Sequence, residues 1–193
     1  MSMTLDELKT ILDQEGLKYF VDPKRPVVML GARGLFGSFH CVIRLDNDGQ
    51  FLQFRTVSYM YCPADHPNIA AVLRLLASLN YRLRMVKFGW DPSDGEIVVY
   101  ADCWLVDSGI TRQQFSRMMT SYLPTLDIFS DRIRKVIDTG DDPGDPGPDA
   151  LMAALLGGQS LPPELRELLA RLRSDDDSDS SADDDDDDDV SRP

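Results

Sequence analysis

Apolar residues in the first 140 positions follow two spacings, and these predict helices and strands in turn. Helical spacing, three or four residues apart, marks four segments, at about 4–15, 67–80, 111–122 and 126–137. Alternating or continuous apolar runs mark five strands, at 27–33, 36–45, 51–58, 83–90 and 96–106. The order αβββαββαα favours an α+β domain with a mainly antiparallel five-stranded sheet and helices on one face.

Local signals set the ends of these elements. Thr4 and Thr111 each begin a capping box, with Glu7 and Gln114 at the third helical position. Turn-forming residues at 46–49 and 94–95 predict two hairpins. Pro124 predicts a break between the last two helices, because proline cannot donate a helical hydrogen bond.

Alternation along the strands separates a core face from an amphiphilic face. On the strand predicted at 96–106, one set of alternate positions is uniformly apolar, and the other mixes acidic, apolar and aromatic residues. The residues expected on the amphiphilic face are His40, Val42, Arg44, Phe51, Gln53, Arg55, Met85, Lys87, Val98, Tyr100 and Trp104. Exposed groups of this size favour contact with a partner or a second copy. Coverage by the final helix or a terminal segment, or a small-molecule site, remain alternatives.

The charge divides the chain. Residues 1–140 contain 16 Lys and Arg and 16 Asp and Glu, so the whole net charge of −13 belongs to residues 141–193. We therefore predict a body at 1–140, a Pro/Gly/Asp linker at 141–149, a short amphipathic helical arm at 150–173 and a disordered acidic tail at 174–193. A neutral body argues against direct nucleic-acid binding.

Motifs with possible chemistry have simpler interpretations. Gly31, Gly34 and Gly37 lack the spacing of a phosphate-binding loop and predict a tight turn. The run 46–49 resembles a calcium loop, but its twelfth position is Val57, where a glutamate is needed. His40 and Cys41 are neighbours on a strand and point to opposite faces, which disfavours a shared zinc. Without a nucleophile constellation, we expect no catalytic residues, metal or cofactor.

The environment predicted for the chain is a reducing cytoplasm. Three cysteines, at 41, 62 and 103, are odd in number and lack metal-type spacing. No apolar run approaches 18 residues, so we expect no membrane span. Cys41 and Cys103 fall on the predicted core face, and Cys62 lies in a loop where it could be exposed.

The body also resembles a known group of proteins. The cues are a helix ending in Asn80, a strand closing at Trp90-Asp91, the turn at 94–96, a helix beginning at Thr111 and the sequence Gly16-Leu17-x-Tyr19. These features, over about residues 4–138, resemble the bacterial YbjN-like and type III secretion chaperone-like families. The resemblance implies an α+β chaperone-like fold, often dimeric, that binds peptides or proteins without catalysis.

Three functional hypotheses follow. The leading one is a protein- or peptide-binding module, possibly homodimeric, whose partner contacts the amphiphilic face. Its candidate contact residues are Val42, Arg44, Phe51, Arg55, Lys87, Val98, Tyr100 and Trp104. The second is a regulator that acts mainly through its acidic tail, as a nucleic-acid mimic or a competitor for basic surfaces. A distant third is an enzyme with an unrecognised site.

Overall fold

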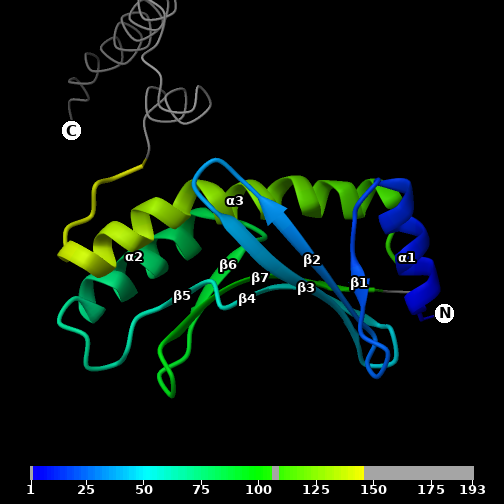
Figure 1. Ribbon diagram of the computed structural model, residues 1–193, viewed down its shortest axis with the longest axis horizontal. Helices are drawn as coiled ribbons and strands as arrows, with labels where there is room; N and C mark the ends of the chain where they lie inside the picture. The colour runs from blue at the N-terminus through cyan, green and yellow to red at the C-terminus, as the bar shows by residue number, and fades with distance from the viewer. Residues whose placement is uncertain (1, 106–108, 146–193) are drawn as a thin grey trace, which may run out of the picture. The chain divides into compact units, whose positions relative to one another are not determined.

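The computed structural model describes residues 2–105 and 109–145, which form an antiparallel sheet and three helices (Figure 1). The predictions for the arm at 150–173 and the tail at 174–193 lie outside the described residues. The helices are α1 (Leu5–Gln14), α2 (Ile69–Arg82) and α3 (Arg112–Thr139). The strands are β1 (Phe20–Val21), β2 (Val27–Arg33), β3 (Ser38–Asp46), β4 (Phe51–Val57), β5 (Met60–Tyr61), β6 (Lys87–Trp90) and β7 (Glu96–Trp104).

The sheet has seven strands, all paired antiparallel. Strands β1, β2, β3, β4 and β7 follow one another across it, and β5 and β6 also pair with β7. The α+β class is thus confirmed, but the predicted count of five strands is too low. The two missing strands, β1 and β5, have two residues each, so neither is long enough to show a period.

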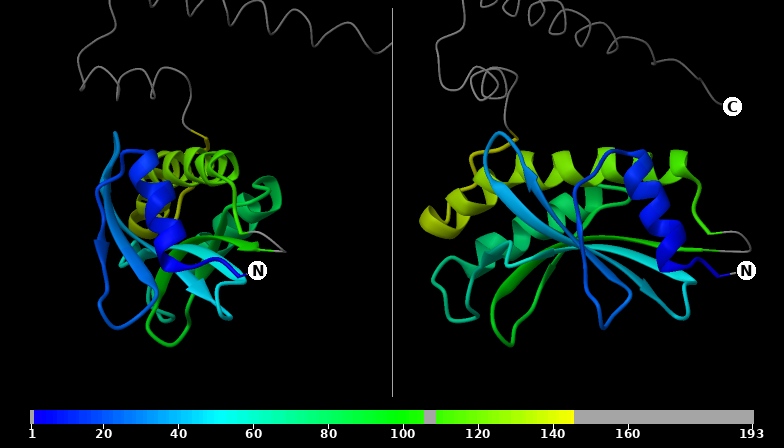
Figure 2. Two further views of the ribbon diagram at one scale, coloured as in Figure 1. Left: turned by 90° about the vertical axis from the view of Figure 1, so that its right-hand side faces the viewer. Right: turned by 45° about the vertical axis from the view of Figure 1, so that its right-hand side comes forward.

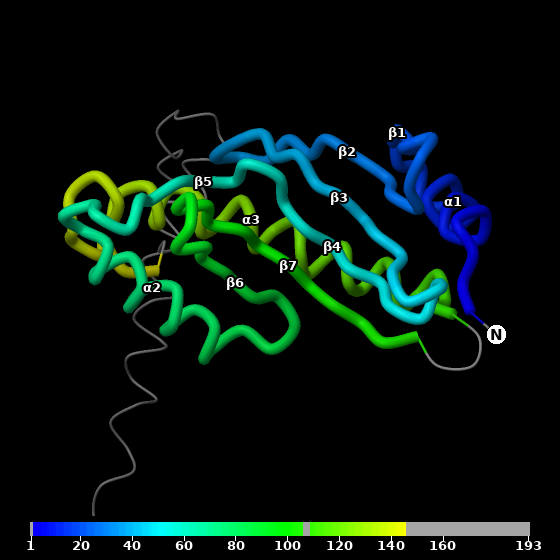
Figure 3. The backbone as a smooth tube through the Cα atoms, turned by 90° about the horizontal axis from the view of Figure 1, so that it is seen from below, coloured from blue at the N-terminus to red at the C-terminus, as the bar shows by residue number. Residues whose placement is uncertain are grey.

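The core lies between the sheet and the helices, which cover one of its faces (Figure 2). Phe54 of β4 marks its centre, with its ring centroid 5.4 Å from that of Phe115 and 5.7 Å from that of Tyr122, both in α3. Each of these side chains is almost fully buried. Seen from below, the strands run in front of α3, and no described helix covers their other face (Figure 3).

Helix α3 is continuous over 28 residues, so the predicted break at Pro124 is wrong. Proline lacks the N–H that would bond the preceding turn. The Thr125 hydroxyl donates a 2.7 Å hydrogen bond to the Ser121 carbonyl and so satisfies one acceptor beside the proline. Tyr122 and Leu126, both buried, hold the helix against the sheet on either side. Packing therefore outweighs the local cost of the proline.

Other end signals are confirmed. Thr4 and Thr111 both form capping boxes, and Gly16 follows α1 in the left-handed region with φ of 68°. Asn47, Asp48 and Gly49 all have positive φ in the turn between β3 and β4. Helix α2, however, does not end at Asn80 but continues to Arg82.

The glycine motif forms the tight turn expected between β2 and β3, and a buried carboxylate from α3 holds it. The N–H groups of Leu35 and Phe36 donate to Asp127, at 2.5 and 2.7 Å. A Cβ on Gly34 would collide with that carboxylate, so any other residue there would have to displace Asp127 from the turn. The N–H groups of this turn therefore bind the carboxylate of Asp127 and not a phosphate.

Two arginines hold the chain after α3. Arg132, nearly buried, forms a bidentate pair with Asp142 at 2.7 and 2.8 Å and also contacts Asp145. Arg82 of α2 donates to the same Asp145 at 2.5 Å. Residues 141–145, the described part of the predicted linker, therefore pack on the body.

Candidate protein-binding surface

The helix-free face of the sheet contains the eight residues predicted to contact a partner. Cross-strand pairing places Val42, Arg55, Tyr100 and Lys87 in one row across β3, β4, β7 and β6. Arg44 and Phe51 lie at the same alternation on β3 and β4, and Val98 and Trp104 on β7. We call this the open face. None of the eight is buried, and Trp104 is 64 % exposed.

Aromatic rings gather at the β7 end of the open face. Phe51 and Trp104 are paired across β4 and β7, with an edge-to-face contact and ring centroids 5.0 Å apart. Tyr100 lies beside Gly89 of β6, where a Cβ would come within 3.2 Å of the tyrosine ring. Large rings with this exposure supply contact area at low entropic cost, as in protein interfaces.

The charged side chains of the open face are largely paired with other groups of the protein. Arg44 donates to Asp46 at 2.7 Å, and Arg55 to Glu96 at 3.3 Å. Lys87 does not project freely, because its ammonium donates to the carbonyls of Asn80 and Leu83, at 2.8 and 2.5 Å. It caps the carboxyl end of α2, where a cation is favoured.

Sequence reasoning missed an apolar region at the other end of the open face. Phe20, 62 % exposed, is aligned with Met29 and Val42 across β1, β2 and β3. A cavity of about 420 Å³ lies here, and Val57 and Gly31 also line it. Alternation within the predicted strand 27–33 could have identified Met29, because its neighbours Val28 and Leu30 are buried. Phe20 had no such signal, since β1 is too short.

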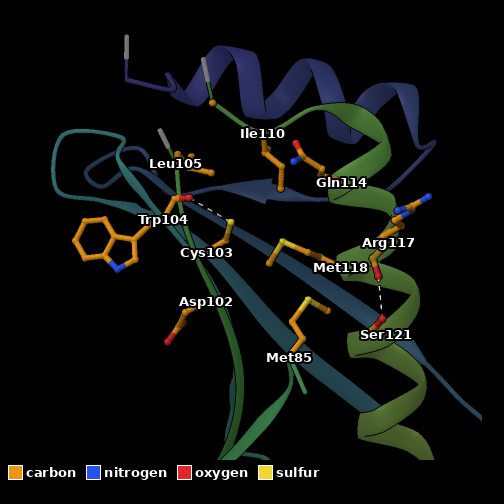
Figure 4. A pocket seen from close by; sticks show the side chains of 11 residues that line it. Met85, Asp102, Cys103, Trp104, Leu105, Ile110, Gln114, Arg117, Met118 and Ser121 are labelled. Carbon is orange, nitrogen blue, oxygen red and sulfur yellow. Dashed lines mark hydrogen bonds between the residues drawn. The ribbon is translucent and has the colours of Figure 1, made fainter. Parts of the chain in front are cut away.

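A second cavity, of about 520 Å³, lies between the end of β7 and the start of α3. Met85, Cys103 and Met118 point into it, whereas the indole of Trp104 points away (Figure 4). Met85 thus packs toward the core side, and its predicted place on the open face is wrong. The lining of this second cavity is mainly apolar, and Gln114 and Ser121 add polar groups.

Burial keeps the Cys41 thiol and the Tyr122 phenol of the core in their neutral forms. Burial raises the pKa of the Cys41 thiol to about 11, which makes it a weak nucleophile at neutral pH. Burial also raises the pKa of Tyr122, whose hydroxyl donates to the Val99 carbonyl at 2.9 Å. Cys62 is buried, contrary to the exposure considered for it.

The described residues contain neither a candidate metal site nor a candidate membrane span. Within residues 2–105 and 109–145, no group of three or more His, Cys, Asp or Glu side chains is placed to hold a metal ion. His40 and Cys41 lie on opposite faces, as alternation predicted. In the same part of the chain, no helix has the length and apolar character needed to cross a membrane.

The layered arrangement, with helices on one side of an antiparallel sheet, is an α+β fold. The family model YbjN, described as "Putative bacterial sensory transduction regulator", matches residues 4–135. The chain therefore belongs to the YbjN family, which confirms the resemblance seen in its sequence. A search of curated proteins found no match.

Three solved structures are similar to this chain at low sequence identity, and the first of them shows the same fold. The crystal structure of YbjN, "a putative transcription regulator from E. coli", has a TM-score of 0.50 and 19 % identity, covering 69 % of this chain and 91 % of that one. The ExsC–ExsE complex gives 0.49 and 16 %, covering 69 % and 97 %. The HopA1–SchA chaperone–effector complex gives 0.43 and 13 %, covering 62 % and 86 %.

Proposed function

We propose that this protein is a non-enzymatic binding module that takes a polypeptide partner on its open face. The observation that carries the proposal is the exposure of aromatic and aliphatic side chains on a sheet face that no described helix covers. Soluble proteins seldom leave such groups together without a partner. Membership of a family described as a sensory transduction regulator is in keeping with action through binding.

The open face offers two kinds of contact. Phe51, Tyr100 and Trp104 form an aromatic end, and Phe20, Met29 and Val57 form a second apolar end. Between them, Arg44 and Arg55 keep their partners Asp46 and Glu96 on the surface. A polypeptide lying across the strands would thus meet apolar contacts at both ends and a polar band between them.

Site-specific photocrosslinking tests the proposal. A photoreactive phenylalanine at Trp104 is expected to crosslink a polypeptide in cells, and Phe51→Ala should reduce its yield. Tyr81 on α2 is a matched control, because it is an aromatic residue that is 92 % exposed but lies away from the open face. Equal crosslinking at Trp104 and Tyr81, or no effect of Phe51→Ala, would refute a specific site.

The same experiment addresses the homodimer. We propose that a second copy competes for the open face, as isologous interfaces use one patch on both subunits. Crosslinked products of twice the chain mass of 21.7 kDa, increasing with protein concentration, are the expected result. Products that contain a single chain and a different polypeptide at every concentration would exclude self-association there.

A further inference from the structure

The two edge strands of the sheet, β6 and β2, differ in whether their outward-facing backbone N–H and C=O groups have hydrogen-bond partners. At β6, the side chain of Asn80 imitates a neighbouring strand. The Phe88 N–H donates to the Asn80 Oδ1 at 2.8 Å, and the Asn80 Nδ2 donates to the Phe88 carbonyl at 2.8 Å. This amide occupies the β6 edge at Phe88, and an incoming strand would have to replace it there.

The opposite edge, at β2, is only partly covered. Strand β1 pairs with Val28 and Met29, and the chain then turns toward α1, so that β1 and β2 diverge (Figure 1). The N–H of Leu45 in β3 donates to the Pro26 carbonyl. Antiparallel pairing alternates, so even-numbered residues of β2 bond to β3 and odd-numbered ones face outward.

Gly31 and Arg33 are the odd-numbered residues of β2 that do not pair with β1. Among the described residues, neither their N–H groups nor their carbonyls have a hydrogen-bond partner on this outer edge. Their backbone therefore offers two donors and two acceptors in the spacing of a β-ladder. This is the part of the sheet where another strand could be added.

The side chains around this edge indicate what such a strand would carry. A Cβ built on Gly31 has nothing within 4 Å, and the cavity of about 420 Å³ lies beside it, lined by Phe20, Met29 and Val57. Arg33 is exposed and makes no ion pair within the described residues. Gly31 and Arg33 lie on the same face, two residues apart.

We propose that the β2 edge at Gly31 and Arg33 is a strand-addition site for an extended segment of the partner. This inference rests on the proposed function and names the mode of binding. Residues directly opposite each other in a sheet share a face. The segment would place an apolar side chain opposite Gly31, in the cavity, and a carboxylate two residues away, opposite Arg33.

A synthetic peptide supplies the test. The probe is a fluorescein-labelled Ser-Thr-Asp-Thr-Phe-Thr-Ser peptide, whose Asp lies opposite Arg33 when its Phe lies opposite Gly31 in antiparallel pairing. It is titrated with the full-length protein and followed by fluorescence anisotropy. Binding is expected, with the amide hydrogens of Gly31 and Arg33 exchanging more slowly in NMR spectra of the complex. Absence of binding, or binding without protection of these two amides, would overturn the proposal.

Variants at one position separate backbone from side-chain effects. Gly31→Pro removes an unpaired edge N–H and is expected to weaken binding about tenfold, the effect of losing one hydrogen bond. Gly31→Ala retains the N–H and has room for its Cβ, so it should bind within about twofold of wild type. Equal affinities of the two variants would contradict a backbone-mediated site.

Changes in the peptide provide a test that does not depend on folding of a variant. Methylating the two peptide nitrogens that would face β2 should abolish binding to the wild-type protein, and replacing Asp with Lys should weaken it. Unchanged affinity of the methylated peptide would overturn strand addition. If the edge proposal fails in this way while crosslinks at Trp104 persist, the proposed function stands and only its mode of binding is wrong.

Discussion

The two faces of the sheet are encoded by alternate residues of the same strands, yet they have opposite chemistry. On β3, Cys41 and Ile43 are buried beneath the helices, whereas Val42 and Arg44 lie on the open face. The covered face is almost entirely apolar, with Thr56 as a buried exception on β4, and its buried side-chain polar atoms all have hydrogen-bond partners in the described residues. The open face is mixed and incompletely covered. The difference indicates that one face provides stability and the other is available for contact.

The largest effect is expected from the covered face. Phe54→Ala removes a ring that packs on Phe115 and Tyr122 and should lower the free energy of unfolding by about 3–5 kcal/mol. Gln53→Ala, the next residue but on the open face, should cost less than about 1 kcal/mol. Urea denaturation measures both. Similar losses for the two variants would contradict the division between faces.

The next effect concerns the turn held by Asp127. Asp127→Ala leaves the N–H groups of Leu35 and Phe36 without their carboxylate, and should lower the free energy of unfolding by about 2–4 kcal/mol. Asp131→Asn is the control, since Asp131 pairs only with Lys135 on the surface of the same helix. Thermal denaturation of both variants tests this, and equal melting temperatures would refute the role of Asp127.

A smaller effect depends on pH. Hydrogen bonding from Arg132 lowers the pKa of Asp142, and hydrogen bonding from Arg82 lowers the pKa of Asp145. Because both folded-state pKa values lie below those of the unfolded chain, their contribution is present above about pH 4 and is lost as the pH falls through the folded-state values. Asp142→Asn should cost about 1 kcal/mol at pH 7 and less near pH 3.

Denaturation at the two pH values provides the measurement for this pair. Asp141→Asn serves as its control, because the Asp141 carboxylate makes no ion pair in the part of the chain that the structure describes. A cost of Asp142→Asn that grows as the pH falls would contradict the assignment.

The smallest effect on stability is expected at Trp104. Trp104→Ala removes an exposed ring whose closest aromatic contact is Phe51, and should change the free energy of unfolding by less than about 1 kcal/mol. The same substitution should strongly reduce the yield of partner crosslinks from a photoreactive phenylalanine placed at Tyr100, on the same face of β7. A stability loss as large as that of Phe54→Ala would show that Trp104 belongs to the core instead.

Sequence patterns predicted the longer elements well because those elements repeat a period many times. The strand predicted at 27–33 matches β2, and the strand predicted at 51–58 differs from β4 by one residue. Local rules failed where tertiary contacts decide. Pro124 lies within a helix because buried neighbours hold it. Met85 lies before β6, which begins only at Lys87, so the alternation of the predicted strand 83–90 does not apply to it and it packs toward Met118.

The candidate surface was predictable in part for the same reason. Alternation placed Val42, Arg55 and Tyr100 on one face, and the cross-strand register of the structure aligns them in one row. It could not reveal that the ammonium of Lys87 caps α2, or that Asn80 occupies an edge, because both contacts join separate elements. Nor could it reveal that Asp127 meets a turn more than 90 positions earlier.

That contact between Asp127 and the Gly34–Phe36 turn has a mechanical consequence. The tip of the β2–β3 hairpin is fastened to the middle of α3 by two short hydrogen bonds. The hairpin and the helix must therefore move as a single body unless both bonds break. A load applied to β2 from outside would be transmitted directly into α3, the longest of the described helices.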